Sequence, residues 1–153
     1  MRIISGSFRG KKLLEPKDIK TRPLKDIVKE SIFNIIYHSK KFEINFENSN
    51  ILDLFSGVGS FGIECLSRGA KYVTFVENYD KVLSVLKANL KNLKLVNNYK
   101  ILEFDINQNL KLKQIDEKFD IIFLDPPFKE KNLYKILNSI YDENLLQTNG
   151  III

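Results

Sequence analysis

Apolar residues change their spacing along the chain, and this change predicts the fold. From Ile51 onward, short apolar runs alternate with longer segments in which apolar residues recur at helical spacing. The runs predicted to be strands span residues 51–54, 72–76, 99–104, 119–124 and 151–153, the last one after an Asn149-Gly150 turn. Strands separated by helix-length segments form parallel βαβ units with right-handed crossovers. The pattern therefore predicts an α/β protein with a doubly wound parallel sheet.

The segments between these strands carry the pattern of amphipathic helices. A Gly-rich turn leads into a helix predicted over residues 61–68, and Asn78 is a suitable cap for the next helix. A further helix is expected around residues 133–140. The middle helix has the clearest apolar face, which comprises Val82, Leu83, Leu86, Leu90 and Leu93.

The first 45 residues form a separate pattern that we interpret as a basic appendage to a core of residues 46–153. Residues 2–14 contain two short β-prone runs around a Gly/Ser turn, as in a hairpin. A helix then opens at Thr21-Arg22-Pro23, because proline suits the first turn. Lys25, Lys29 and Glu30 should face solvent or a ligand. The stripe expected to be buried comprises Leu24, Ile27, Val28, Ile32, Ile35 and Ile36.

Composition narrows the class of protein. The chain has 153 residues, of which 44% are hydrophobic and 28% charged, as expected for one soluble domain. No apolar run is long enough to span a membrane, and the N-terminus does not resemble a signal peptide, so a cytoplasmic protein is expected. The only cysteine, Cys65, excludes an internal disulfide and is expected in the core. With one histidine, His38, no metal site is expected.

The excess positive charge is confined to the N-terminal third. Residues 1–50 hold 11 basic and 6 acidic side chains, and residues 51–153 hold 13 of each, which together give the net charge of +5. Since lysine and arginine bind phosphate backbones, this segment is a candidate nucleic-acid contact, the alternative being a solubilising arm. The candidate contact residues are Arg2, Arg9, Lys11, Lys12 and Arg22.

A glycine-rich segment follows the first strand and is a candidate nucleoside site. Gly57 and Gly59 allow positive φ and a close approach of ligand to backbone, and Gly62 allows a helix to pack closely on a strand. Glu77 follows the second strand, twenty residues after Gly57, where it suits ribose hydroxyls. The candidate cofactor-binding residues here are Asp53, Phe55, Ser56, Gly57, Gly59 and Glu77.

The charge of this segment favours one cofactor over another. A carboxylate of Asp53 at the mouth of the first strand would repel the pyrophosphate of NAD, which the glycines alone would accept. The same carboxylate suits the cationic sulfonium and amino groups of S-adenosylmethionine. Asp105, after the third strand, is a further candidate, as an acceptor for the adenine amino group; a solvated loop carboxylate is the alternative.

The fourth strand ends in the most specific motif, Asp125-Pro126-Pro127-Phe128. An exocyclic amino group on a base is a poor nucleophile, and hydrogen-bond acceptors around its two hydrogens favour the tetrahedral geometry that it needs. Asp125 supplies one acceptor and the Pro126 carbonyl another, with Pro127 fixing the backbone. Phe128 offers a face on which an extruded base can stack. We predict that these four residues are catalytic, the alternative being a plain turn after a strand.

Together these motifs resemble the RsmD family of class I methyltransferases, which methylate a guanine N2 in bacterial 16S ribosomal RNA. Beyond the glycine-rich segment with Glu77 and the Asp125 to Phe128 motif, three further stretches resemble the family. They are the chain's opening at residues 2–10, Arg22-Pro23 with Asp26 and Lys29-Glu30, and residues 67–70. Lys29 stands where the family usually has arginine. The resemblance implies a Rossmann-like fold, S-adenosylmethionine as cofactor, a basic segment that grips ribosomal RNA, and Arg22 and Pro23 near the cofactor cleft.

The resemblance also implies the partner and leaves several alternatives. The expected substrate is 16S ribosomal RNA or an assembling small ribosomal subunit, and a monomer is the expected state. An adenine-N6 methyltransferase is the nearest alternative, because Asp-Pro-Pro-Phe serves either amine. An NAD-dependent oxidoreductase and a nucleic-acid-binding module with a vestigial cofactor site are the others. Because the chain ends in three isoleucines at a sheet edge, we expect either a missing C-terminal segment or a partner that covers this edge.

Overall fold

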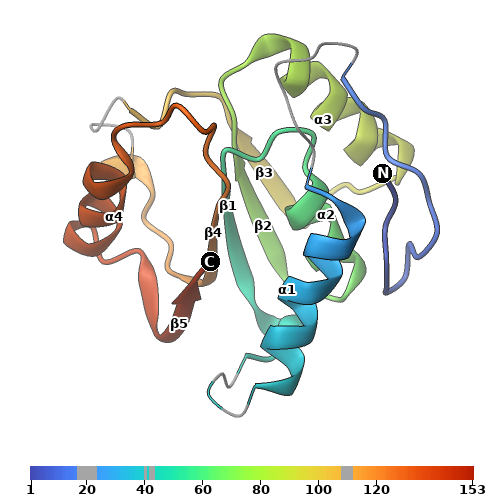
Figure 1. Cartoon of the computed structure of the whole chain (residues 1–153), viewed down its shortest axis with the longest axis horizontal. Helices are drawn as coiled ribbons and strands as arrows, with labels where there is room; N and C mark the ends of the chain where they lie inside the picture. Colours follow the sequence, from blue (N-terminus) through green and yellow to red (C-terminus); the bar gives the residue numbers. More distant parts are fainter. Residues whose placement is uncertain (17–23, 40, 42–43, 108–111) are drawn as a thin grey trace.

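The computed structural model describes residues 1–16, 24–39, 41, 44–107 and 112–153. Within these residues, the sheet has five strands in the order β3-β2-β1-β4-β5, and every pair is parallel (Figure 1). The strands are β1 (Asn50–Leu54), β2 (Tyr72–Val76), β3 (Tyr99–Leu102), β4 (Phe119–Leu124) and β5 (Leu146–Ile152). The predicted doubly wound parallel sheet is therefore confirmed, and β2 and β4 have the predicted bounds.

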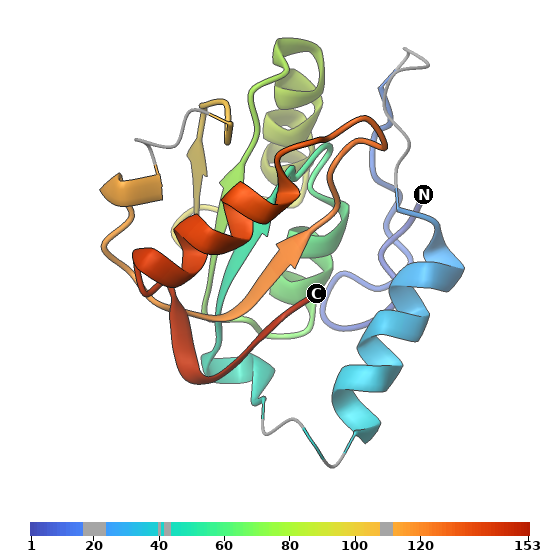
Figure 2. The ribbon, with the colours of Figure 1, turned by 60° about the vertical axis from the view of Figure 1, so that its left-hand side comes forward.

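Helices cover both faces of this sheet. The described helices are α1 (Asp26–His38), α2 (Ser60–Ser67), α3 (Asp80–Asn92) and α4 (Leu133–Asp142), with short 3-10 turns η1 (Phe46–Asn48) and η2 (Leu112–Gln114). α1, α2 and α3 lie on one face, and α4 lies on the other (Figures 1 and 2). Successive residues of β1 accordingly enter different apolar clusters: Ile51 packs with Phe61 and Leu86, whereas Leu52 packs with Ile136 and Ile140. This is a three-layer arrangement.

The N-terminal arm, residues 1–16, turns back on itself as predicted for a hairpin. Arg2 and Lys12 form an isolated antiparallel bridge, and Ile3 N donates to Lys11 O at 2.9 Å. Ile3 and Leu13 are buried in the same cluster as Phe33 of α1 and Ile51 of β1. The arm therefore packs directly on the α1 and α2 side of the molecule.

The predicted buried stripe of α1 is right only in part: Ile36 is buried, and Leu24 and Ile32 pack against the core. Ile27 and Ile35 are 71% and 61% exposed, and the residues that face the core are Lys29, Phe33 and Ile36. Lys29 was expected to face solvent or a ligand, but its side chain is fully buried, because it forms an ion pair with the buried Glu64 of α2. This long-range pair accounts for a lysine on the buried face of α1, which apolar spacing alone does not predict. The predicted start at Thr21-Arg22-Pro23 lies outside the described residues.

Two boundary predictions also fail. α3 begins at Asp80 and not directly after Asn78, and the acceptor at its start is Glu77, whose carboxylate receives the N–H groups of Asn78 and Tyr79. β5 begins before the predicted Asn149-Gly150 turn, so that both residues lie inside the strand. The ladder is irregular there, since Phe119 pairs with Leu146 whereas Ile121 pairs with Ile151. An irregularity of this kind absorbs the turn-forming residues without ending the strand.

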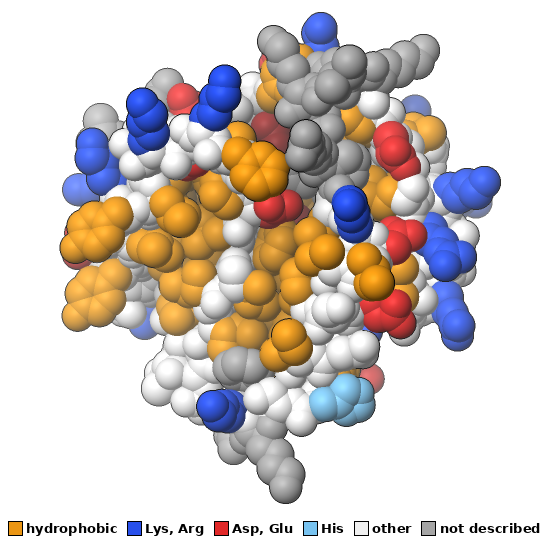
Figure 3. All heavy atoms as spheres, in the orientation of Figure 1, with side chains coloured by type: hydrophobic (Ala, Val, Ile, Leu, Met, Phe, Trp, Pro, Cys, Tyr) orange, Lys and Arg blue, Asp and Glu red, His pale blue; other side chains and the backbone are white. Residues whose placement is uncertain are grey.

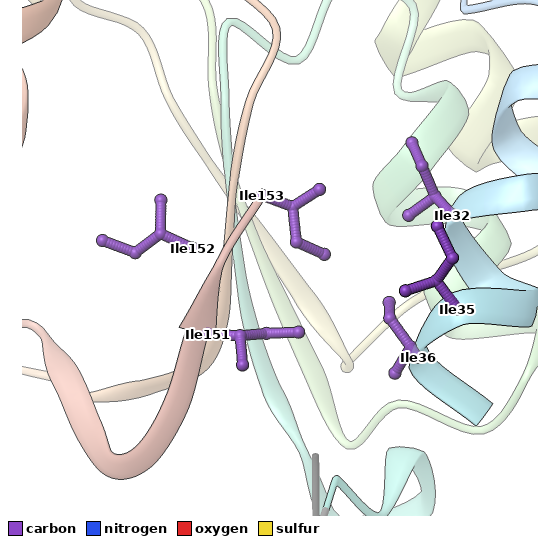
Figure 4. A pocket seen from close by; sticks show the side chains of 6 residues that line it. All are labelled: Ile32, Ile35, Ile36, Ile151, Ile152 and Ile153. Carbon is purple, nitrogen blue, oxygen red and sulfur yellow. The ribbon is translucent and has the colours of Figure 1, made fainter. Parts of the chain in front are cut away.

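An apolar groove of about 360 Å³ lies between α1 and the end of β5. It is lined by Ile32, Ile35 and Ile36 of α1 and by residues 151–153. Ile151 and Ile153 point toward α1, and Ile152 points to the opposite side of the strand (Figure 4). Apolar side chains also gather on the surface between α1 and α4, with lysine and arginine side chains around the margin (Figure 3). None of the described helices is long and apolar enough to cross a membrane.

Candidate active site

The register of the sheet brings three functional segments to one edge. Leu54, the last residue of β1, pairs with Val76 on one side and with Leu124 on the other, so the three strands end at the same level. The residues that follow are therefore neighbours: the glycine loop (residues 55–59), Glu77, and the catalytic loop (residues 125–128). Carboxyl ends of parallel strands are where ligands bind in open α/β sheets. The predicted cofactor and catalytic motifs thus share one edge of the sheet.

The glycine loop has a compact backbone that glycine makes possible. Phe55, Gly57 and Gly59 have φ of 60°, 56° and 83°. At Gly59, an added Cβ would lie 2.5 Å from Leu86 Cδ1, so a side chain would meet both backbone strain and a clash. The loop is tied to β2 by Ser56, whose N donates to Val76 O at 3.0 Å. The predicted positive φ at both glycines is confirmed.

The predicted close packing at Gly62 is also confirmed. Gly62 lies in the first half of α2, over the β2 strand. An added Cβ would lie 2.3 Å from Phe75 Cε1 and 2.8 Å from Val73 Cγ1. Gly62 therefore lets α2 approach the sheet, which places the glycine loop close over the ends of the strands.

Glu77 connects the glycine loop to the residues that precede α3. One of its carboxylate oxygens accepts the Gly57 N–H at 2.8 Å, and the other accepts the N–H groups of Asn78 and Tyr79, each at 2.9 Å. Its side chain therefore fixes the glycine loop relative to the start of α3. A carboxylate oxygen has more than one acceptor site, so these bonds are compatible with ribose hydroxyls as additional donors.

Asp53 lies beneath the glycine loop. It is the next-to-last residue of β1, in keeping with the expected place at the mouth of that strand, but it is buried: the residue is 1% exposed, and its Oδ2 accepts the Gly62 N–H at 3.0 Å. Burial, with the charges of Asp125 and Glu77, raises the pKa of Asp53 to about 8, although the Gly62 hydrogen bond opposes this. A cation bound above the loop would favour the ionised carboxylate, so the residue suits a positively charged ligand.

The catalytic loop is open, in contrast to the glycine loop. Asp125 is exposed at the surface, yet desolvation by the surrounding protein raises the pKa of its carboxyl group. The Phe128 side chain is 93% exposed, as suits a platform for a base. Glu130 N donates to Pro127 O at 2.8 Å and so closes a turn after the two prolines.

A polar cluster connects the catalytic loop to the loop after β3. Glu130 accepts the Asn107 side-chain amide at 3.0 Å and the Asn132 N–H at 2.7 Å, and these donors lower the pKa of its carboxyl group. The Asn132 side-chain amide donates in turn to Asn107 Oδ1. Asp105 accepts the Asn107 N–H at 3.0 Å, which holds its carboxylate in a local turn. Apart from Asp105, sequence reasoning did not single out this cluster, because its two halves, residues 105–107 and 130–132, are more than twenty residues apart.

The predicted nucleic-acid contacts lie on the surface of the N-terminal arm. Arg2, Arg9, Lys11 and Lys12 are all exposed. Arg2 lies 3.6 Å from Asp26 of α1, and Lys11 Nζ lies 4.9 Å from the centre of the Phe8 ring. Arg22 and Pro23, predicted near the cofactor cleft, lie outside the described residues.

Sequence reasoning also missed a group of buried polar residues behind the site. Glu64 of α2 is fully buried and pairs with Arg68 at 2.9 Å and with Lys29 at 3.5 Å. Asn89 of α3 is 2% exposed. Asn89 recurs at the spacing of Val82, Leu86 and Leu93, and a polar residue on an otherwise apolar helix face was the signal that could have identified it. No group of three or more potential metal ligands occurs among the described residues.

Comparison with known proteins assigns the family. A family model described as "Conserved hypothetical protein 95" matches residues 1–153, the whole chain. The chain belongs to this family. It is 38% identical over 158 residues to the Haemophilus influenzae protein named "Ribosomal RNA small subunit methyltransferase D", an alignment that covers 99% of this chain and 76% of that protein. The resemblance to the RsmD family is therefore confirmed.

Two further similarities support this assignment. The chain is 40% identical over 154 residues to the YlbH protein of Bacillus subtilis, covering 100% of this chain and 80% of that protein. A solved structure of the Escherichia coli protein yhhF superposes with a TM-score of 0.83 at 31% identity, covering 99% of this chain and 77% of that one. The predicted fold class and the predicted enzyme class, a methyltransferase, are thus confirmed.

Proposed function

We propose that this protein transfers a methyl group from S-adenosylmethionine to the exocyclic N2 of a guanine in small-subunit (16S) ribosomal RNA. The observation that carries the proposal is the common edge of β1, β2 and β4, where the glycine loop, Glu77 and Asp125 meet. Family membership supports the methyltransferase class, and the relative named for ribosomal RNA small subunit methylation supports the substrate. A ribosomal RNA substrate implies action in the cytoplasm, and we expect the protein to act as a monomer.

The described residues fit the proposed cofactor. A Cβ added at Gly57 would have nothing nearer than Phe55 O at 4.0 Å, so the loop leaves room for a ligand against its backbone. Glu77 lies beside Gly57 as a hydrogen-bond acceptor for a ribose, and Asp53 lies beneath the loop as a charge that favours a cation. Asp105 is the proposed acceptor for an adenine amino group. S-adenosylmethionine supplies an electrophilic methyl group, which the base nitrogen takes by direct displacement.

The catalytic loop provides hydrogen-bond acceptors and a proton acceptor for the amino nitrogen of the base. The carboxylate of Asp125 and the carbonyl oxygen of Pro126 accept the two hydrogens of the amino group, which localises the nitrogen lone pair. Asp125 then takes the proton that the nitrogen loses as its bond to carbon forms. Because the pKa of Asp125 is raised, its carboxylate is a stronger base than an ordinary one. Phe128 stacks on the extruded base.

The experiment that tests the proposal is nucleoside mass spectrometry after methyl transfer. Small ribosomal particles from cells lacking the modification are incubated with the protein and labelled S-adenosylmethionine, and the RNA is then digested. We expect label in N2-methylguanosine at one position. Methyladenosine as the sole product would replace the proposal with the adenine-N6 alternative, since the Asp125 to Phe128 motif serves either amine. Absence of label from every RNA, together with intact RNA binding, would favour a binding module.

Calorimetry with NAD tests the remaining enzyme class. We expect binding of S-adenosylhomocysteine and no binding of NAD, because the Asp53 carboxyl group beneath the glycine loop suits a cation and not a pyrophosphate. NAD binding in preference to S-adenosylhomocysteine would contradict the proposed cofactor.

A further inference from the structure

The N-terminal arm is held to the body by buried side chains that also contact the cofactor segment. Two such connections exist in the part of the chain that the structure describes. One runs through Lys29 and Glu64 to Ser60, and the other runs through Asn89 to Val58. Ser60 directly follows Gly59, and Val58 directly precedes it. Both connections therefore end on the same short stretch of backbone.

The first connection begins with the buried carboxylate of Glu64. Its two oxygens accept the N–H groups of Ile4 and Ser5, at 2.8 and 2.9 Å. Glu64 lies one helical turn after Ser60, and its carboxylate also faces Lys29 Nζ at 3.5 Å. The arm backbone is therefore bound to α2, the helix that the glycine loop opens.

Lys29 completes this connection. Its ammonium group donates to Arg2 O at 2.8 Å and to Ser60 Oγ at 3.4 Å, while its side chain is fully buried. One buried cation thus joins the arm, α1 and the first residue of α2. Burial lowers the pKa of Lys29, and the charges of Glu64 and Asp26 oppose this shift.

Asn89 forms the second connection with one side-chain amide. Its Oδ1 accepts the Leu14 N–H at 2.7 Å, and its Nδ2 donates to Leu14 O at 3.2 Å and to Val58 O at 3.1 Å. The amide therefore binds both backbone groups of one arm residue and one carbonyl of the glycine loop. A shift of either the arm or the loop would leave part of a buried amide without a partner, which is unfavourable.

Gly6 shows how closely the arm backbone approaches α2. It has a φ of 80°, and an added Cβ would lie 1.7 Å from Ser67 O at the end of α2. Ser67 in turn accepts the Phe8 N–H through its hydroxyl group at 3.0 Å. The arm backbone therefore packs directly against α2, the helix that follows the glycine loop.

We infer that Lys29 and Asn89 are positioning residues that couple the basic arm to the glycine loop, so that cofactor binding and RNA binding favour each other. The inference rests on the proposed function, in which the loop holds the cofactor, and on the prediction from charge that the basic arm contacts RNA. A cofactor that orders residues 57–59 also orders Val58 O and Ser60, and through Asn89 and Lys29 it orders the arm. By linkage, RNA on the arm strengthens cofactor binding by the same factor.

The experiment measures this reciprocal coupling. Affinity for small ribosomal particles that lack the modification is measured with and without saturating S-adenosylhomocysteine, and affinity for S-adenosylhomocysteine is measured with and without these particles. We expect each ligand to tighten the other on the order of tenfold in the unaltered protein. In Asn89→Ala and in Lys29→Met, each of which leaves the other connection intact, we expect this ratio to fall partly, and in the double variant we expect it to fall toward one. Lys29→Arg keeps a buried cation with several donors and should retain the coupling.

Matched controls separate coupling from loss of stability. Leu90→Ala, on the residue next to Asn89, removes buried apolar contacts and should lower the thermal midpoint while leaving the coupling ratio unchanged. Ser60→Ala removes only the hydroxyl group that Lys29 reaches, so it provides a variant that folds if Lys29→Met does not. We expect Ser60→Ala to reduce the ratio partly, because the Asn89 connection remains.

Hydrogen exchange provides a second readout that needs no RNA. S-adenosylhomocysteine should slow exchange of the Ile4, Ser5 and Leu14 amides in the unaltered protein, and the effect at Leu14 should vanish in Asn89→Ala. If the protein binds neither ligand, the proposed function fails. If it binds both with a coupling ratio of one, or if Asn89→Ala retains the full ratio, the proposed function stands and this inference is overturned.

Discussion

The glycine loop and the catalytic loop follow neighbouring strands at the same level, yet their surroundings differ. The glycine loop contains the buried residues Ser56, Val58 and Gly59, and its backbone is bonded to Glu77 and to β2. In the catalytic loop, Asp125, Pro127 and Phe128 are exposed. The proposed cofactor half of the site is therefore largely buried, whereas the proposed target half presents its groups to solvent.

This difference separates the expected effects of substitutions. Changes in the glycine loop should alter stability and cofactor affinity together, because the same buried bonds serve both. Changes in the catalytic loop should alter methyl transfer and RNA affinity while leaving the fold intact, because exposed side chains contribute little to stability. The predictions below test that separation, from the largest expected effect to the smallest.

Asp125→Ala should give the largest loss. It removes a proton acceptor and a hydrogen-bond acceptor for the attacking amine, so we expect kcat to fall by on the order of 10³-fold. Affinity for S-adenosylhomocysteine should stay within about twofold, because the groups that surround the glycine loop are untouched. Single-turnover methyl transfer and calorimetry measure the two quantities. Asp116→Ala, on another exposed aspartate, is the matched control and should be neutral; retained activity in Asp125→Ala would contradict the proposed role.

Gly59→Ala should damage the cofactor half. A left-handed conformation at a non-glycine residue costs about 1–3 kcal/mol, and the new methyl group would also press on Leu86. We therefore expect a lower free energy of unfolding in urea and weaker binding of S-adenosylhomocysteine. Gly10→Ala is a useful comparison, since Gly10 also has positive φ but an added Cβ there meets nothing within 4 Å. If Gly59→Ala lost stability but kept its cofactor affinity, the expectation that the same buried contacts serve stability and cofactor binding would be contradicted.

Phe128→Ala should weaken RNA binding roughly tenfold, since stacking of a base on an aromatic ring is lost. The thermal midpoint should hardly change, because the ring is 93% exposed. Phe128→Tyr keeps the aromatic face and should bind RNA normally. A large fall in stability, or equal effects of alanine and tyrosine, would exclude a stacking role.

The pH dependence of cofactor binding should be the smallest effect, a few-fold per pH unit. The pKa of Asp53 is raised to about 8, so the free protein holds this proton at neutral pH. A cationic ligand favours the ionised form, and affinity for S-adenosylmethionine should therefore rise between pH 6 and 8. S-adenosylhomocysteine, which lacks the sulfonium charge, should show a shallower rise. Asp53→Asn should flatten both profiles. An unchanged slope in that variant would show that a group other than Asp53 causes the pH dependence.

The same proton predicts the opposite trend for stability. In the unfolded chain Asp53 has its ordinary pKa of 3.8, so between that value and about 8 the folded state binds more protons. The free energy of unfolding contributed by this group therefore falls as pH rises through that range. Urea titrations of the unaltered protein and of Asp53→Asn at pH 6 and pH 8 measure the difference.

Local patterns predicted the sheet well and the N-terminal helix poorly. The bounds of β2 and β4 follow from short apolar runs, because a parallel strand that is buried on both faces consists of nearly continuous apolar residues. The face of α1 depends on a pair between Lys29 and Glu64, which no local period reveals. The pattern counted Ile27 and Ile35 as core because they are apolar, although the helix turns them outward.

In the candidate site, too, local sequence patterns did not reveal long-range side-chain contacts. Motif spacing correctly predicted that Gly57, Glu77 and Asp125 lie at one edge of the sheet, because parallel strands of similar length end together. Spacing did not reveal that Asp53 is buried beneath the loop, nor that Glu77 accepts the Gly57 N–H. These features depend on how α2 packs over the sheet and on side-chain hydrogen bonds made in three dimensions.

A crystal structure with S-adenosylhomocysteine bound is the most direct measurement. We expect the ribose hydroxyls on Glu77, the ligand against the backbone of residues 55–59, and its sulfur atom directed toward the Asp125 carboxylate. A ligand seated elsewhere, or a sulfur atom turned away from Asp125, would contradict the view that two strand ends hold donor and acceptor face to face.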